Sequence, residues 1–181
     1  MTLITTNPDS TDVASVSFTS SIDSTYKLYI FKFYAVNPVT DAVGFQFQVN
    51  ATDGADYDDS AITSTSFRAQ HKEADDQAEV GYITGADQAQ GTAFQPVLVY
   101  LSNGSDDSGA GEMHLFNPAS TTYVKHFFSK IQGVFQPADD PSPGNYAMVC
   151  FAAGNFNTTT AIDDIQFKFS TGNFDGTIAL Y

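Results

Sequence analysis

The stretch IQFKFSTGNFDGTIALY, residues 165–181, decides the fold class. Ile165, Phe167 and Phe169 alternate with polar residues, which is the period of two that a β-strand with one buried face shows. The segment STGNFDG that follows holds a glycine, an asparagine and an Asp-Gly pair, which tolerate the positive φ of hairpin turns. We therefore expect the last two strands to form an antiparallel hairpin that ends on Tyr181.

The stretch GFQFQVN, residues 44–50, shows the same alternation. Its apolar side chains should face the core, and the three polar side chains between them should face water. The apolar positions are Phe45, Phe47 and Val49, and the polar positions are Gln46, Gln48 and Asn50.

The stretch YKLYIFKFYAV, residues 26–36, is apolar on both faces. A strand buried from both sides, in the centre of a sandwich or under a neighbouring subunit, has this pattern. Because large exposed apolar patches are rare on monomers and usually mark an interface, we expect a partner chain to contact this strand. The residues assigned to partner binding are Leu3 and Ile4 near the N-terminus and Tyr29, Phe31 and Phe33 of the strand.

About eleven short runs with strand character follow one another, separated by segments rich in Gly, Asn, Asp and Pro. This pattern predicts an all-β fold, an antiparallel β-sandwich of the jelly-roll kind. The one helix-like stretch, residues 66–80, lacks a sustained apolar stripe and is expected to be a loop. The further runs are at 13–18, 61–67, 78–84, 94–101, 111–116, 121–128, 130–136 and 146–152.

A chain of 181 residues suits one domain, which we place at residues 13–181. Residues 1–12 mix two apolar residues with polar and turn-forming ones. They form either an N-terminal arm that lies on a neighbouring chain or an edge strand of their own sheet.

The charge balance is strongly acidic, with 7 Lys and Arg against 21 Asp and Glu, a formal net charge of −14. Such a surface repels phosphate backbones and anionic lipids, so we expect no direct binding to nucleic acid or membrane. The N-terminus lacks a secretion signal, so we expect a protein that is made in a cytoplasm and stays soluble. We expect the acidic groups to gather on one face, and a nearer-neutral face to hold most of the seven basic residues and bind a partner.

No constellation of catalytic residues is present, so the sequence predicts no enzymatic activity and no cofactor. Cys150 lies in an apolar run and is expected to be a small buried hydrophobe. His114 and His126 lie on one expected hairpin and could be cross-strand neighbours, but no third ligand follows at zinc spacing, and His71 is remote in sequence. We therefore predict no metal site.

Two acidic loops, residues 52–59 and 103–112, offer oxygen ligands of the kind that calcium prefers. Neither fits the EF-hand spacing, and solvated loops are the favoured interpretation. Exposed aromatic side chains on a sandwich can also stack on sugars, which leaves a carbohydrate-binding module as a rival hypothesis. The absence of Trp weakens it.

Four segments together resemble a family of small virion-associated proteins of tailed bacteriophages from aquatic bacteria. They are FTSSIDSTYKLYIFKF, ADQAQGTAFQ, LFNPASTTYVKHFF and TAIDDIQFKFSTGNFDGTIALY, and the resemblance spans residues 13–181. It implies a structural protein of the virion. A compact single domain without fibrous repeats or an enzyme signature suits a capsid decoration or cement protein, which would bind the major capsid protein on the capsid surface and stabilise the capsid. Such proteins are commonly trimers, so we expect a homotrimer. The alternative is a tail-fibre or receptor-binding module of the phage tail, and the family carries no catalytic residues.

Overall fold

The regular structure of the chain is β-strand throughout the part that can be described. A computed structural model describes residues 1–7, 10–51, 57, 60–136 and 145–181. The strands within these ranges form two sheets, one of ten strands and one of four, and every strand pairing is antiparallel. The all-β antiparallel fold that the sequence predicts is confirmed, and the two sheets are arranged like a sandwich.

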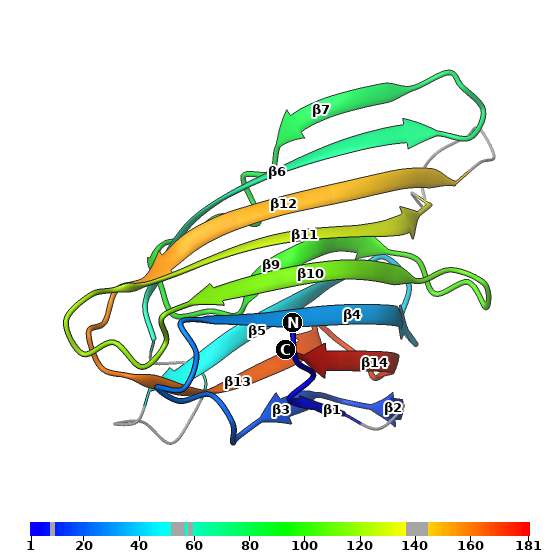
Figure 1. The fold of residues 1–181 in the computed structure, drawn as a ribbon. Helices are drawn as coiled ribbons and strands as arrows, with labels where there is room; N and C mark the ends of the chain where they lie inside the picture. Colours follow the sequence, from blue (N-terminus) through cyan, green and yellow to red (C-terminus); the bar gives the residue numbers. More distant parts are fainter. Residues whose placement is uncertain (8–9, 52–56, 58–59, 137–144) are drawn as a thin grey trace.

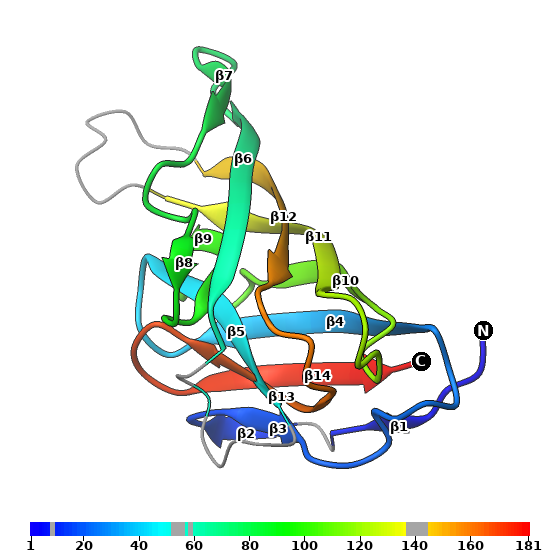
Figure 2. The same cartoon turned by 90° about the vertical axis from the view of Figure 1, so that its left-hand side faces the viewer.

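The small sheet lies behind the large one in Figure 1, and Figure 2 shows both from the side. The large sheet runs in the order β1 (Thr5–Thr6), β14 (Phe174–Leu180), β4 (Leu28–Pro38), β10 (Gly109–Phe116), β11 (Lys125–Phe135), β12 (Tyr146–Phe156), β6 (Ile62–Lys72) and β7 (Ala78–Tyr82), with β2 (Ser10–Val13) beside β14 and β8 (Ala89–Gly91) beside β6. The small sheet runs in the order β3 (Val16–Phe18), β13 (Ile162–Phe169), β5 (Val43–Ala51) and β9 (Gln95–Leu101).

From β3 onward the chain alternates between the two sheets. β3, β5, β9 and β13 lie in the small sheet, and the strands between and after them lie in the large one. A jelly roll divides eight strands between two sheets, whereas here β10, β11 and β12 form a meander in the middle of a much larger sheet. The jelly-roll assignment therefore stays a prediction.

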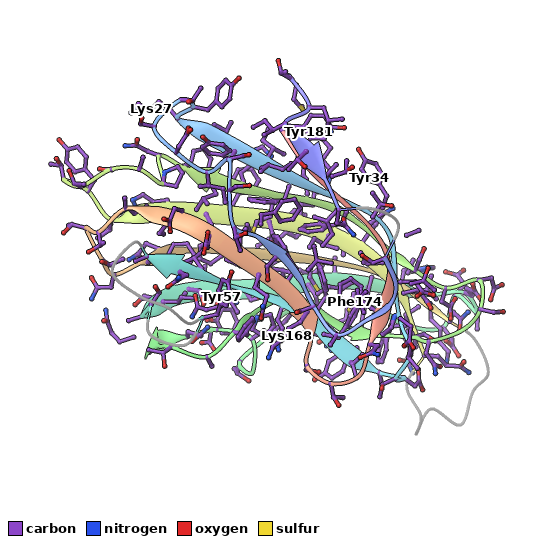
Figure 3. All side chains as sticks on the ribbon, turned by 90° about the horizontal axis from the view of Figure 1, so that it is seen from below. Lys27, Tyr34, Tyr57, Lys168, Phe174 and Tyr181 are labelled. Atoms are coloured by element: carbon purple, nitrogen blue, oxygen red, sulfur yellow. The ribbon has the colours of Figure 1, made fainter. Side chains whose placement is uncertain are left out.

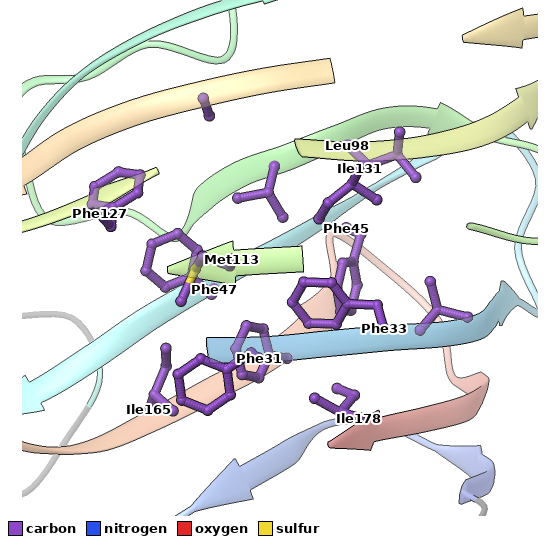
Figure 4. Packing of buried hydrophobic residues seen from close by; sticks show 14 of the residues in the cluster. Phe31, Phe33, Phe45, Phe47, Leu98, Met113, Phe127, Ile131, Ile165 and Ile178 are labelled. Atoms are coloured by element: carbon purple, nitrogen blue, oxygen red, sulfur yellow. The ribbon is translucent and has the colours of Figure 1, made fainter. Parts of the chain in front are cut away.

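Phenylalanine rings from both sheets fill the space between them. Phe167 of β13 is fully buried, and its ring centroid lies 5.1 Å from that of Phe31 and 5.2 Å from that of Phe33, both on β4. Phe45 and Phe47 of β5 lie 6.0 and 6.1 Å from the same ring. Figure 4 shows how the rings from β4 and β5 meet. The two period-two patterns of the sequence are confirmed, since Phe45, Phe47, Val49, Ile165, Phe167 and Phe169 are all buried.

The predicted C-terminal hairpin is wrong. β13 pairs with β3 and β5 in the small sheet, whereas β14 pairs with β4 in the large sheet. The turn between them crosses from one sheet to the other, with Gly172 at a φ of 77°. Across this turn the rings of Phe169 and Phe174 lie 5.4 Å apart, so the two strands pack their apolar faces against each other through the core. The same turn residues suit a crossing between sheets as well as a hairpin.

The prediction that the polar residues of β5 face water is also wrong at two of its three positions, because Gln48 and Asn50 are both buried. Gln48 is fully buried, and its Nε2 donates hydrogen bonds to the backbone carbonyl oxygens of Ser60 and Thr92, at 3.1 and 2.9 Å. Loop segments therefore cover this side of the small sheet and satisfy the polar group that they bury.

Several strand boundaries differ from those predicted. The helix-like stretch 66–80 is no loop: β6 and β7 pair through it, with His71 opposite Ala78. The runs at 121–128 and 130–136 belong to one strand, β11. The described ranges nevertheless hold fourteen strands rather than about eleven, because β1, β2 and β8 match no predicted run. In residues 66–80, long polar side chains occupy positions on both faces of the strands, so the alternation of apolar and polar residues that marks a strand is not seen in the sequence.

The N-terminal segment adds to the edge of its own sheet. Thr5 lies opposite Leu180, and the backbone N–H of Ile4 donates to the carbonyl oxygen of Leu180 at 2.8 Å. Ile4 packs against the core, whereas Leu3 is exposed. Of the two alternatives for residues 1–12, the described part of the segment takes the edge strand. Tyr181 extends the ladder through reciprocal backbone hydrogen bonds with Ile30, each 2.9 Å long.

Replacing Phe167 with Ala should lower the free energy of unfolding by about 3–5 kcal/mol, because the ring leaves a cavity among five others. Phe128→Ala is the matched control: Phe128 is 39% exposed, so its loss should cost much less. Urea unfolding followed by circular dichroism measures both. Equal losses for the two variants would contradict the packing described here.

Candidate functional site

The side of the large sheet that faces away from the small sheet is here named the outer face. Side chains alternate across a strand, and the alternate residues of these strands are buried against the small sheet, which fixes the opposite set as outward. The strand registers then place the following residues of six strands on the outer face: Leu28, Ile30, Lys32 and Tyr34 of β4; Ala110, Glu112, His114 and Phe116 of β10; His126, Phe128, Lys130, Gln132 and Val134 of β11; Ala147, Val149, Phe151, Ala153 and Asn155 of β12; Thr63, Thr65, Phe67, Ala69 and His71 of β6; Ala78, Val80 and Tyr82 of β7.

Three of the residues assigned to a partner from sequence lie inside the molecule. Tyr29, Phe31 and Phe33 are at most 1% exposed and pack in the core, so no partner chain reaches them. The outward residues of the same strand include Leu28 and Tyr34, which are exposed. The apolar pattern on both faces of residues 26–36 is thus correct, but the assignment of the faces is reversed.

The outer face is almost free of carboxylates. Of the 14 Asp and Glu residues in the described ranges, Glu112 alone is among the outer-face positions of these six strands, and of the seven basic residues the face holds Lys32 and Lys130. The near-neutral face expected from the charge balance is therefore present. The expectation that it holds most of the basic residues is wrong, because five of the seven lie elsewhere.

Exposed apolar side chains gather on this face. Of the twelve large hydrophobic residues that are exposed in the described ranges, six lie on it. They are Leu28, Tyr34, Phe67, Val80, Tyr82 and Phe128. Large exposed apolar patches of this kind mark sites that bind other molecules.

A row of large side chains crosses the middle of the outer face from β7 to β4, and we name it the ridge. The Phe67 and Phe151 rings stack at a centroid distance of 4.8 Å, and Lys130 Nζ lies 5.9 Å from the Phe151 centroid. Lys32 Nζ lies 3.8 Å from Glu112 Oε2. In order, the ridge consists of Tyr82, Phe67, Phe151, Lys130, Glu112 and Lys32.

Beside the ridge runs a trough. It consists of two hollows of about 730 and 360 Å³ that share Ala110, Gln132 and Val149. Its central row of outward side chains is Val80, Ala69, Val149, Gln132 and Ala110, of which all but Gln132 are short. Gln70, His71, Glu79 and Met148 also line the larger hollow. A third hollow, of about 440 Å³, lies on the other side of the ridge, around Ala153 and Asn155.

Two tyrosines border the trough at the β4 end. Tyr34 and Tyr181 lie near one another (Figure 3), and the hydrogen bond between their hydroxyls raises the pKa of Tyr34. Lys32 Nζ lies 5.8 Å from the centroid of the Tyr181 ring. Aromatic rings and a cation therefore lie together at this end of the face.

All three histidines lie on the outer face, but they do not converge. His114 stacks on Phe128 at 4.4 Å and its Nε2 lies 3.2 Å from Glu112 Oε1. His126 lies opposite Phe116 on the neighbouring strand, so the two histidines are diagonal neighbours. In the described part of the chain, no three His, Cys, Asp or Glu side chains come close enough together to hold a metal ion.

Cys150 and Lys125 are two of the buried groups that could react, and both have structural surroundings. Cys150 is 1% exposed, and burial raises the pKa of its thiol, which disfavours the nucleophilic thiolate. Lys125 is fully buried, and its Nζ donates a hydrogen bond to the backbone carbonyl oxygen of Thr158 at 3.2 Å and another to that of Thr160. Burial lowers the pKa of this amine. Its bonds hold the loop between β12 and β13.

The acidic loops give no calcium site that can be described. Asp53, Asp56, Asp58 and Asp59 lie outside the described residues. In the second loop, the backbone carbonyl oxygen of Asp107 accepts a hydrogen bond from Asn37 Nδ2 at 2.6 Å. This bond ties the loop to β4.

Acidic crowding is present at the start of β13. Burial first, and the neighbouring charge of Asp163 second, raise the pKa of the Asp164 carboxyl, while a hydrogen bond with Asn50 lowers it. Because the folded pKa lies above the unfolded value of 3.8, the ionised carboxylate costs stability, and the cost develops as the pH rises through and above 3.8.

Asp164→Asn should therefore raise the free energy of unfolding at pH 7, and the gain should disappear below about pH 3.8, where the carboxyl is neutral in both states. Thermal unfolding of both proteins across this pH range measures the difference. A variant that is less stable than the parent at pH 7 would contradict the assigned cause. Asp175→Asn is the control: its carboxamide Oδ1 can still accept the hydrogen bond of the Asp12 backbone N–H, so the free energy of unfolding should change little across the same pH range.

The comparisons with known proteins return no relative. No protein-family model matches the chain, and neither does any curated protein or solved structure. The described residues contain no helix with the length and apolar character needed to cross a membrane.

Proposed function

We propose that this protein is a non-enzymatic structural protein of a phage virion, a decoration or cement protein that binds the outer capsid surface and stabilises it. The observation that carries the proposal is the outer face, where exposed aromatic and aliphatic side chains coincide with a near absence of carboxylates. A surface of this kind is suited to burial against another protein, since few charges must be desolvated. The phage context comes from the sequence resemblance alone.

In this proposal the outer face binds the major capsid protein and the acidic groups point toward solvent. The described strands present a broad surface with open hollows, as expected for protein docking rather than for the conversion of a small substrate. A homotrimer on the particle agrees with the closed symmetry common among such assemblies. Neither nucleic acid nor membrane is a proposed partner.

A tail-fibre or receptor-binding module is the second candidate. The trough is the observation that favours it, because a hollow flanked by Phe67, Phe151 and Tyr34 could hold a sugar between aromatic rings. The two candidates differ in number of copies on the particle. A capsid coat needs hundreds of copies, and a tail site needs a handful.

The test is quantitative mass spectrometry of purified virions that carry the protein. We expect hundreds of copies per particle. We also expect a reduction of at least about tenfold when Val80 and Tyr82 are both replaced with Ser, because they are the most exposed large hydrophobic residues of the outer face and would bury the most apolar area on the capsid. Tyr123→Ser is the control: Tyr123 is 70% exposed and lies off the outer face, so occupancy should not change.

A handful of copies per particle would move the protein to the tail. Full occupancy by the Val80→Ser, Tyr82→Ser variant would remove the outer face from the capsid contact. Circular dichroism of the variants checks that they fold before occupancy is measured.

A further inference from the structure

We propose that, off the particle, the outer face is covered by the outer face of a second copy of this chain, in a two-fold contact that places the ridge of each copy in the trough of the other. The inference rests on the proposed function in one respect: the same face is then available to the capsid once the pair separates. It concerns the free protein, and its test does not need a particle.

The size of the face is sufficient for a specific contact. From β7 to β4 it spans six strands at about 4.8 Å each, or roughly 29 Å, and four rows of outward side chains at about 6.7 Å each, or roughly 27 Å. The product is roughly 800 Å² per copy, which is the area that each partner buries in a standard protein–protein interface. Left in water, this surface would be a large apolar patch for a monomer.

Charge selects the second copy as the occupant. Of the 14 acidic residues in the described ranges, 13 lie off the outer face, so the rest of the described surface is strongly negative. A contact between the outer face and another part of a second copy would bury carboxylates at a high desolvation cost. A contact between two outer faces buries the Lys32–Glu112–Lys130 group of each copy, brings Glu79 to the border of the contact, and leaves the other described carboxylates in water.

Shape selects the two-fold arrangement. The ridge and the trough are adjacent rows on the same strands, two residues apart along each of them. On β6, Phe67 is in the ridge and Ala69 is in the trough, and on β12 Phe151 is in the ridge and Val149 is in the trough. Consider a two-fold axis that lies in the plane of the interface and runs between the two rows, parallel to them. Rotation about this axis places the ridge of each copy over the trough of the other, so that Phe67 of one copy contacts Ala69 of the other.

The same axis also suits the charged end. It sets Lys130 of one copy against Gln132 of the other, Glu112 against Ala110, and Lys32 near Tyr34, whose ring can accept a cation. No two like charges of the ridge meet. An axis along the strands would instead place ridge on ridge and leave both troughs empty, which forfeits the dispersion contacts of a packed interface.

The test is a size exchange on β6, followed by sedimentation velocity of the purified full-length protein. We expect the wild type to form dimers with a dissociation constant of micromolar order. Phe67→Ala leaves the trough of the second copy unfilled, and Ala69→Phe sets two rings against each other, so each single variant should weaken the dimer by at least about tenfold. The double variant, Phe67→Ala with Ala69→Phe, exchanges the large and small positions and should restore it to within about threefold.

Phe151→Ala with Val149→Phe is the second exchange, on β12, and keeps the test open if a β6 variant does not fold. Tyr123→Ser, off the face, should leave the dimer unchanged. The proposal is overturned by a monomer at all concentrations, by a trimer, by single variants that associate as tightly as the wild type, or by folded double variants that do not recover. Since a monomer or trimer in solution is compatible with hundreds of copies on the capsid, failure here leaves the proposed function standing.

Discussion

The packing of Phe167 against rings from the opposite sheet is the interaction on which the rest of the structure depends. It requires β4 to present Phe31 and Phe33 inward. Because side chains alternate, that requirement directs Ile30, Lys32 and Tyr34 outward. The registers of β10, β11, β12 and β6 carry the same division across the whole large sheet. The face of the large sheet that packs against the small sheet thus determines which residues lie on the outer face.

The outer face is unusual for a protein of this charge. An outward face on a chain with a net charge of −14 would normally share the acidic residues, yet here Glu112 is the one carboxylate among its described positions, and it lies beside Lys32. The same face carries stacked rings, such as Phe67 on Phe151. The exposed apolar side chains and the scarcity of carboxylates both indicate a surface that is covered by another protein when this protein functions.

The sequence predicts those parts of the fold that depend on neighbouring residues along the chain. The alternation at Phe45 and Phe47 and at Phe167 and Phe169 identifies two strands and their buried faces, because polar residues mark the other face. In residues 26–36 this mark is missing. Both sets of side chains are apolar, and only the position of the second sheet decides that Phe31 is buried and Tyr34 is not.

Other features depend on contacts between distant segments, which a local pattern does not carry. β13 and β14 follow one another closely but join different sheets, a choice made by the strands that pair with them. Gln48 is buried because loop carbonyl groups meet its amide. The outer face itself combines residues from β4 to β7 that no single stretch brings together. Alternate residues on β6, β11 and β12 were the available signal, but only once the registers were known.

Hydroxyl-radical footprinting with a mass-spectrometric readout tests the central claim, that the outer face is a protein-binding surface, most directly. Tyr82, Phe67 and Phe128 report on the face, and Tyr123 and Tyr100, which are also exposed, report on the remaining surface. The account predicts that the first three become protected as the protein assembles, in solution or on the particle, while the other two stay reactive. Equal reactivity of both groups in the assembled state would contradict it.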